Sequence, residues 1–293
     1  MNRSAIFLFA LLISSLACSI ASTPSQTSQP GVETIVAATM QALASPPGQQ
    51  LPTETGPIFN GTEINTNTAK LIIPTGMAAG ATMTKIPPSG AEAPYWEMTP
   101  GHDELDFNGY VLQNRFHEPR ITIYPAGAFA AMNDGAAENI RRLQIILANP
   151  SVPINDDLLP HIPFFNAGAV FSAQIQTIQF QNGVGVRMLT QYAQSYAIVN
   201  NHELFYHFQG LTSDGAQYII AILPISVPFL AENWEATVPA DGIPFPGYDN
   251  PNADFEAYYQ QVIVKLNSTQ PDVFTPSLSA LDAMIQSLLI KSP

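Results

Sequence analysis

The segment at residues 200–207, NNHELFYH, has the residue types of a zinc metalloprotease motif but not their spacing. In that class of enzyme the pattern H-E-x-x-H places two histidines four residues apart on one face of a helix. Here His202 and His207 are five residues apart, which separates them by about 500° around a helix and places them on opposite faces of a strand. We therefore predict a strand after Asn201 and no shared metal.

The other residues that could support catalysis do not form a recognised motif. His102 lies in the acidic segment GHDELD, which lacks the spacing and central glycine of an EF-hand, so we expect a solvated loop. His117 is expected in a turn between two strands, and His161 lies between two prolines. There is no G-x-S-x-G, and residues 183–185, GVG, lack the rest of a dinucleotide fingerprint. These patterns predict no catalytic residue, no metal site and no cofactor.

Acidic side chains leave one catalytic alternative open. Asp156 and Asp157 are adjacent and lie beside a proline-rich segment. A glycosidase needs no local motif, because the fold can bring two distant carboxyl groups together. Two such groups about 5–10 Å apart in a deep cleft would favour an enzyme. Exposed aromatic side chains on a shallow surface would favour a binding protein.

The N-terminus predicts export and lipid anchoring. Arg3 precedes an apolar run at residues 5–13, which is too short to span a bilayer and is typical of a signal peptide. Cys18, the only cysteine, follows this run directly and resembles the acylated cysteine of a bacterial lipobox, although Ser15 replaces the usual leucine. We predict cleavage before Cys18 and lipid attachment to it. The alternative is ordinary signal cleavage after Ala21.

The composition limits the partners of the mature protein. The net charge is −13, and only 11% of the residues are charged. An acidic chain does not favour nucleic acid or a polybasic attachment to anionic lipid. We therefore expect contact with the membrane through the N-terminal lipid, and with an unidentified protein or small-molecule ligand outside the cytoplasm.

Three regions follow from the distribution of residue types. Residues 1–17 form the signal peptide, and residues 18–65 form a stalk rich in Ser, Thr and Pro, with a possible short helix at residues 32–44. Residues 66–293 form the folded domain. Within it, residues 75–105 are rich in Pro and Gly and are expected to form loops, held by a buried pair of Tyr95 and Trp96.

Periodicity predicts strands first and helices at the end of the domain. The expected strands are residues 69–74, 110–115, 120–125 and four runs between residues 168 and 224, which Asn-Gly, Asn-Asn and Asp-Gly turns separate into an antiparallel meander. A bulge is expected between Ile175 and Ile178, and the last run is apolar on both faces, so it should lie in the middle of the sheet or be covered on both sides. The expected helices begin at Asp134, at residue 254 and at Thr275-Pro276.

Part of the sequence resembles a known group of proteins. Residues 110–224, with GVRMLTQYAQ and NNHELFYHFQGLTSDG, and the closing FTPSLSALDAMIQSLL, are similar to uncharacterised bacterial surface lipoproteins with a Ser/Thr/Pro stalk. The order of elements is also loosely similar to the PsbP-like α+β fold. The resemblance implies an α+β domain on a lipid anchor, and it implies no activity.

These observations lead to one expected architecture and role. We predict a single α+β domain in which helices pack on one face of an antiparallel sheet. We expect an exported, lipid-anchored, non-catalytic binding or interaction module at the cell envelope. The alternatives are an extracytoplasmic hydrolase with carboxylates assembled by the fold, and a structural part of an envelope complex.

Overall fold

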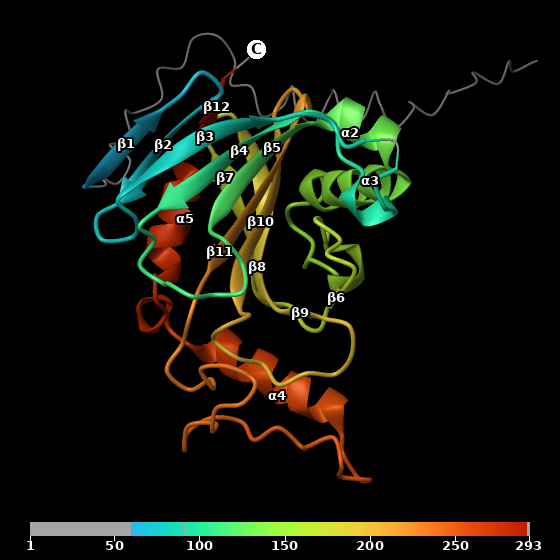
Figure 1. Ribbon diagram of the computed structural model, residues 1–293, viewed down its shortest axis with the longest axis vertical. Helices are drawn as coiled ribbons and strands as arrows, with labels where there is room; N and C mark the ends of the chain where they lie inside the picture. The colour runs from blue at the N-terminus through green and yellow to red at the C-terminus, as the bar shows by residue number, and fades with distance from the viewer. Residues whose placement is uncertain (1–59, 91, 292–293) are drawn as a thin grey trace, which may run out of the picture. The chain divides into compact units, whose positions relative to one another are not determined.

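A seven-stranded antiparallel sheet with the order β3-β4-β5-β11-β10-β8-β7 forms the centre of the domain (Figure 1). The computed structural model describes residues 60–90 and 92–291. The seven strands are β3 (Gly80–Ile86), β4 (His102–Asn108), β5 (Arg120–Pro125), β7 (Ala173–Phe180), β8 (Gly183–Thr190), β10 (Phe205–Thr212) and β11 (Gln217–Pro224). The sheet therefore consists of two meanders, β3-β4-β5 and β7-β8-β10-β11, which join where β5 pairs with β11.

Two small sheets and four α-helices complete the architecture of the described residues. β1 (Gly61–Asn65), β2 (Ala69–Pro74) and β12 (Leu289–Ile290) form one small sheet, and β6 (Gly168–Ala169) pairs with β9 (Tyr192–Ala193). The helices are α2 (Ala126–Met132), α3 (Asp134–Ala148), α4 (Phe255–Ser268) and α5 (Leu278–Gln286), with 3-10 turns at η1 (Tyr95–Glu97), η2 (Asp156–Leu158) and η3 (Pro271–Val273). Within the described ranges, no helix combines the length and apolar character needed to cross a bilayer.

The expected meander is confirmed, and local sequence explains its turns. The β10–β11 hairpin turns at Asp214 and Gly215, and Gly215 has a φ of +69°, which glycine adopts without a steric penalty. β11 pairs with β5 on one side and β10 on the other, as its two apolar faces predict. The bulge in β7 lies between Ala173 and Gln176. Turn chemistry and burial therefore set the register of this half of the sheet.

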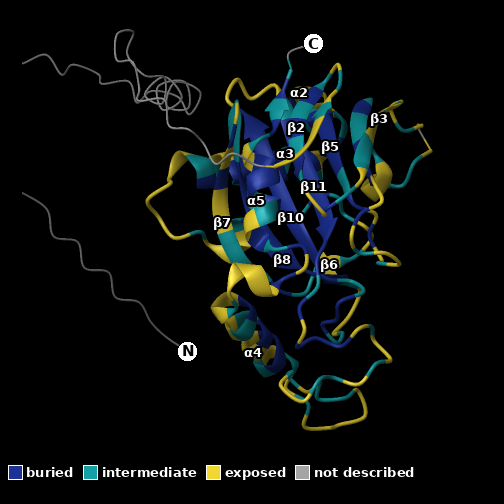
Figure 2. Cartoon of the chain, turned by 90° about the vertical axis from the view of Figure 1, so that its left-hand side faces the viewer, coloured by how far each residue is buried: buried dark blue, intermediate teal, exposed yellow. Residues whose placement is uncertain are grey.

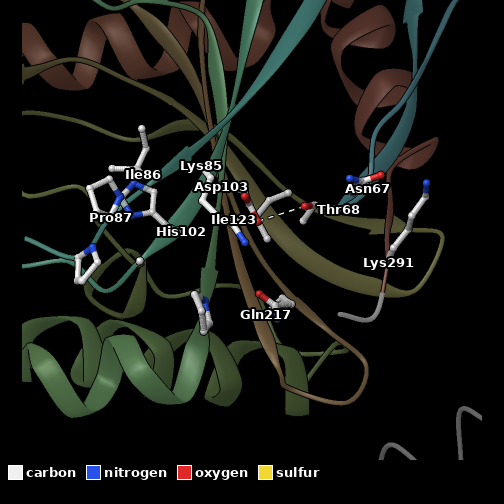
Figure 3. A pocket seen from close by; sticks show the side chains of 13 residues that line it. Asn67, Thr68, Lys85, Ile86, Pro87, His102, Asp103, Ile123, Gln217 and Lys291 are labelled. Atoms are coloured by element: carbon white, nitrogen blue, oxygen red, sulfur yellow. Dashed lines mark hydrogen bonds between the residues drawn. The ribbon is translucent and has the colours of Figure 1, made fainter.

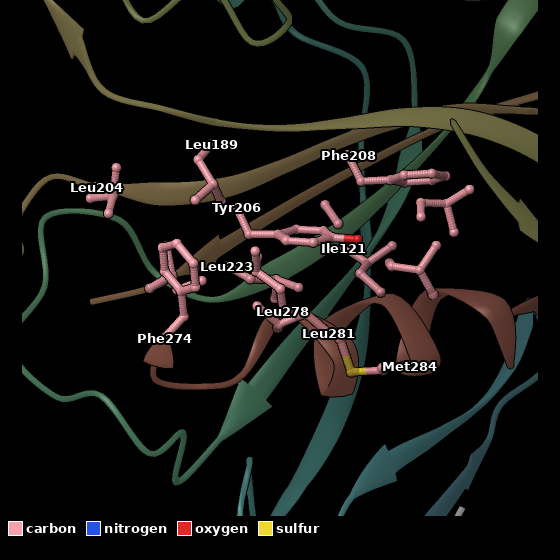
Figure 4. Close-up of a cluster of buried hydrophobic side chains, with 14 of the residues drawn as sticks. Ile121, Leu189, Leu204, Tyr206, Phe208, Leu223, Phe274, Leu278, Leu281 and Met284 are labelled. Atoms are coloured by element: carbon pink, nitrogen blue, oxygen red, sulfur yellow. The ribbon is translucent and has the colours of Figure 1, made fainter. Parts of the chain in front are cut away.

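One side of the large sheet, which we call the α5 face, packs against α5, α4 and the small β1-β2-β12 sheet (Figures 1 and 4). Tyr206 and Phe208 of β10 and Leu223 of β11 meet Leu281 of α5 on this side. Burying a side chain of this size contributes about 1.5–3 kcal/mol each. This face therefore contains the larger part of the apolar core.

The opposite side, which we call the α3 face, is covered by α2, α3 and the segment at residues 149–167. Its core includes Tyr124 of β5, Phe129 of α2, Leu143 of α3 and Tyr218 of β11. Figure 2 shows the central strands β8, β10 and β11 as buried, because both faces are covered. β10 illustrates this arrangement, since all of its residues are buried.

The α+β antiparallel fold is confirmed, and the two C-terminal helices pack on the same face, as expected. α3 packs on the opposite face, against β8. Its N-cap is Asn133, whose side chain accepts a hydrogen bond from Ala136 N, and not Asp134. The N-cap of α5 is Ser277 and not Thr275. Both caps accept from a backbone N–H three residues later, which is the usual geometry for such side chains.

Three expectations for the first half of the domain are wrong. Residues 110–115 form a loop, in which Tyr110 is fixed by a hydrogen bond from its hydroxyl to Pro224 O (2.9 Å) and Asn114 has a φ of +55°. The segment 75–105 contains β3 and β4, so His102 lies in a strand. Tyr95 and Trp96 are exposed and not a buried pair. β3 and β4 are polar on one face, which made their sequences resemble loops.

The described structure also begins earlier than the predicted domain boundary. β1 lies before residue 66 and pairs with β2 along its length. The signal peptide, Cys18 and the possible helix at residues 32–44 lie outside the described residues.

Candidate functional site

A cavity of about 370 Å³ opens on the α3 face, and we call it the sheet-face pocket. Its floor is a row of side chains across three neighbouring strands, because Glu104 of β4 pairs with Thr122 of β5, and Thr122 pairs with Ile220 of β11. Two loops form the walls: His117 comes from the loop before β5, and Phe165 comes from the segment that covers the α3 face. The antiparallel register therefore brings together residues from four separate parts of the chain.

Three buried polar side chains in this pocket have no hydrogen-bond partner. His117, Thr122 and Tyr124 are only 9%, 6% and 6% exposed, and all three line the cavity. None of their side chains makes a hydrogen bond to another residue in the described part of the chain, and their polar atoms are not among the fully buried unpaired atoms, so solvent reaches them from the cavity. The two hydroxyls and the imidazole are therefore free to bind water or a ligand.

An ion-pair network lies at one end of the pocket. Arg120 Nε donates to Asp106 Oδ1 (3.0 Å), and Arg120 Nη1 donates to Glu104 Oε1 (3.1 Å). His102 Nε2 lies 3.5 Å from the same Glu104 oxygen. The hydrogen bond from His102, assisted by the charge of Arg120, lowers the pKa of Glu104 despite its burial. Glu104 is therefore ionised at neutral pH, and Arg120 is held between two carboxylates.

The imidazole of His117 and the phenol of Tyr124 are neutral near pH 7. Burial lowers the pKa of His117 to about 4, with a smaller effect from His202. Burial also raises the pKa of Tyr124. Neutral imidazole has one donor and one acceptor, and a phenol has both, so these groups are suited to hydrogen bonding.

Aromatic rings form the rim of the pocket. Phe116 is 63% exposed and Phe165 is 39% exposed. The His117 ring lies between them, with centroid distances of 4.9 Å to Phe116 and 5.0 Å to Phe165. Phe165 has a φ of +44°, in the left-handed region that bulky residues rarely adopt, and such strain is concentrated at functional sites. The strained backbone presents an apolar ring to solvent beside the cavity.

The loop that carries Phe165 is fixed to the sheet and to α3. Asn139 Oδ1 of α3 accepts from His161 N (2.7 Å). His207 Nε2 lies 2.8 Å from Ile162 O, and Gln209 Nε2 donates to Pro160 O (2.6 Å). The contacts of His207 and Gln209 use side chains of β10 that point away from the α5 face. They hold one wall of the pocket in place.

A second group of unpaired atoms lies behind this wall. His161 Nδ1, Tyr192 Oη and His207 Nδ1 are buried without a hydrogen-bond partner among the described residues. The Tyr192 ring is 6.3 Å from that of His161 and 6.1 Å from that of His207. Burial lowers the pKa of His161 to about 4 and that of His207 to about 3. The α3 face thus contains an extended region of polar atoms that are not used for internal bonding.

The structure places the two histidines of NNHELFYH in separate environments. His202 lies in the turn before β10, and its Nδ1 is 3.0 Å from Asn114 O. His207 lies in β10, as predicted from alternation, and is fully buried on the α3 face. Across residues 60–90 and 92–291, no three His, Cys, Asp or Glu residues are arranged to hold a metal ion. Asp156 and Asp157 belong to η2 and do not line the pocket.

A larger cavity, of about 720 Å³, lies between the small sheet and β3 and β4 (Figure 3). Three of its buried and half-buried polar groups already have partners: Asp103 accepts from Thr68 Oγ1 (3.2 Å), His102 Nδ1 is 2.8 Å from Pro100 O, and Lys291 Nζ donates to Asn65 Oδ1 (2.7 Å). Lys85 is exposed. By volume, this cavity would be the candidate site. The sheet-face pocket has more buried polar side chains without a hydrogen-bond partner among the described residues, and for this reason we take it as the candidate site.

Sequence reasoning missed this pocket, although one signal was present. The strand at residues 120–125 alternates Arg120, Thr122 and Tyr124 with two isoleucines. Three polar or amphipathic residues on one face of an otherwise buried strand indicate a site on that face. The contributions of His117 and Phe165 depend on loops and carry no such local signal.

Neither a protein-family model, nor a curated protein, nor a solved structure matches the chain. The resemblance to bacterial surface lipoproteins and to the PsbP-like fold therefore stays a prediction.

Proposed function

We propose that the protein is an exported, lipid-anchored binding module of the cell envelope that holds a small molecule in the sheet-face pocket without transforming it. The observation that carries this proposal is the presence of three buried polar side chains, His117, Thr122 and Tyr124, with no protein partner in one cavity. A ligand in the cavity can therefore bond to these groups in place of water, and a typical hydrogen bond contributes about 0.5–1.5 kcal/mol. The cavity volume falls in the range of small-molecule sites.

The charge states in the pocket favour binding over hydrolysis. Glu104 and Glu118 both line the cavity, which is the feature that supports a hydrolase. A general acid needs a pKa near the working pH, but the pKa of Glu104 is lowered and its carboxylate is paired with Arg120. The pKa of His117, which burial lowers to about 4, is also far from neutral pH. The exposed rings of Phe116 and Phe165 are the aromatic surface expected of a binding protein.

Binding is tested by native mass spectrometry of the full-length protein isolated from its own membranes. We expect a bound small molecule on the wild type and its loss from a variant with both Thr122→Val and Tyr124→Phe, which removes the two hydroxyls while preserving shape. Tyr248→Phe, at an exposed position with a hydroxyl bonded to Tyr196 O, is the control and should keep the ligand. A wild-type chain with no ligand, or equal retention by all three proteins, contradicts the proposal.

Anchoring is tested separately at Cys18. We expect Cys18→Ser to move the protein from the membrane fraction to the soluble fraction, and the wild type to carry the mass of the acyl chains. One acyl chain alone binds membranes weakly, so stable attachment requires the multiple chains of a lipoprotein. A serine variant that stays on the membrane, together with a wild type that carries no lipid mass, contradicts the anchor.

A further inference from the structure

We propose that the sheet-face pocket binds an organic cation, a small amine with an apolar part, and this inference rests on the function proposed above. It follows from three separate observations about the pocket: its charge balance, its aromatic rim and its surplus of hydrogen-bond acceptors.

The charge balance around the pocket is negative. Glu104 and Glu118 line the cavity, and Asp106 binds the far side of Arg120. The positive groups are Arg120 and, when protonated, His102, which is bonded to Glu104 and not to the cavity. Three carboxylates therefore face one guanidinium and one imidazole, and Glu118 forms no ion pair with any described residue. An anion entering the pocket would meet uncompensated negative charge, whereas a cation would be attracted.

The aromatic rim adds a second attraction for a cation. Phe116 and Phe165 line the cavity, and the faces of such rings carry partial negative charge. His117 stays neutral at physiological pH, because burial lowers its pKa to about 4, so it adds no positive charge between the two phenylalanines. Exposed rings beside carboxylates are the combination that proteins use for ammonium groups.

The hydrogen-bonding capacity of the pocket also points to a donor ligand. The donors of Arg120 that face Glu104 and Asp106 are already used. The oxygens of Thr122, Tyr124 and Glu118, and one nitrogen of neutral His117, remain available as acceptors. An ammonium group offers several N–H donors, and Ile220 and Ile222 on the floor provide an apolar surface for the rest of the molecule.

Three probes of nearly equal shape separate charge from shape: benzylamine, benzyl alcohol and benzoate. Binding is measured by calorimetry and by saturation-transfer NMR on the full-length protein in detergent near neutral pH. We expect the benzylammonium ion to bind about tenfold more tightly than benzyl alcohol, and benzoate to bind least. Binding of the alcohol or of benzoate as tightly as the ammonium overturns the cation assignment but keeps the pocket. No binding by any probe also overturns the cation assignment, whereas the proposed function is decided separately by the native mass spectrometry described above.

One substitution tests the electrostatic part of the inference. Glu118 is exposed and makes no hydrogen bond within the described ranges, so Glu118→Gln should fold normally. We expect this variant to bind benzylammonium about threefold more weakly, with unchanged affinity for benzyl alcohol. Glu256→Gln, in the first turn of α4, is the matched control and should change neither affinity. Equal weakening of both probes, or no change for the cation, overturns the role of negative charge.

Discussion

The two faces of the large sheet differ in how their buried polar side chains are hydrogen-bonded. On the α5 face, Tyr206 Oη donates to Asp282 (2.9 Å), Arg187 forms an ion pair with the same aspartate (3.2 Å), and Tyr110 Oη donates to Pro224 O. On the α3 face, the side chains of Thr122 and Tyr124 form no hydrogen bond with any described residue. Both sets are buried in the same sheet, so burial alone does not explain the difference.

The unpaired atoms are concentrated on one side of the molecule. Of the buried side-chain atoms without a partner in the described part of the chain, those of His161, Tyr192 and His207 belong to the α3 face, and the other, Arg115 Nε, belongs to the loop before β5. Some groups on the α3 face are paired, as Tyr218 is with Gln209. The comparison indicates that the α5 face stabilises the fold, and that the α3 face keeps polar groups available for a ligand.

The largest effect that we expect is a loss of stability on acidification, caused by the buried histidines of the α3 face. The pKa of His117 and of His161 is about 4 in the folded protein and that of His207 is about 3, against 6.5 for an ordinary histidine. The unfolded chain therefore binds protons first as the pH falls below about 6.5, and stability is lost until the pH reaches the folded values. We expect a loss of about 9 kcal/mol in the free energy of unfolding between pH 7 and pH 4, shared by the three histidines.

Urea unfolding curves recorded at a series of pH values measure this loss. His161→Gln removes one of the three titrating groups and should make the dependence shallower, while the neutral-pH stability changes little. A stability that is flat between pH 6.5 and pH 4 contradicts the assignment of neutral, buried histidines to this face.

The next largest effect should come from breaking the ion pair of the α5 face. Asp282→Ala leaves Arg187, whose side chain is 4% exposed, without its carboxylate partner. Removing one member of a buried pair leaves an uncompensated charge, so we expect a loss of about 3 kcal/mol in the free energy of unfolding. Chemical denaturation measures it, and affinity for benzylammonium should be unchanged. A loss below about 1 kcal/mol would show that this pair is not important for stability.

A matched pair of tyrosine substitutions gives the smallest and most direct comparison. Tyr206→Phe removes a hydrogen bond to a charged carboxylate and should cost about 1.5 kcal/mol in unfolding free energy. Tyr124→Phe removes a hydroxyl without a protein partner and should change stability by less than about 0.5 kcal/mol. Only the second variant should weaken binding in the pocket. Equal costs for the two substitutions would remove the distinction between the faces.

The sequence predicted those elements whose signals are local. The strand at residues 120–125, the hairpin at Gly215 and helix α4 follow from alternation, turn chemistry and helical periodicity. β3 and β4 were missed because their exposed polar residues mimic a loop, and pairing with β5 is what makes them strands. The reverse error occurred at residues 110–115, where alternation predicts a strand that has no partner to pair with.

The candidate site was harder to predict than the fold, because its parts meet only through pairing over long distances. Thr122 and Tyr124 could be placed on one face from their spacing alone. The contact of His117 with Phe165 depends on how two loops fold. The side chain of His117 also makes no hydrogen bond with the described residues, and a pattern of residue types cannot reveal this. Burial without a partner is a property of the folded chain.

The position of β1 has a mechanical consequence. Among the described strands, β1 lies at the edge of the small sheet and pairs only with β2, and it is the first described element after Asn60. Tension applied along the chain at Asn60 loads the hydrogen bonds between Gly61 and Pro74 first and then the others in turn, so β1 should be unzipped at low force. The seven-stranded sheet would keep its shape during this step. The five residues of β1 would thus act as an extensible link that lengthens under tension before the pocket is distorted. Optical-tweezer records should show a short, reversible extension before global unfolding.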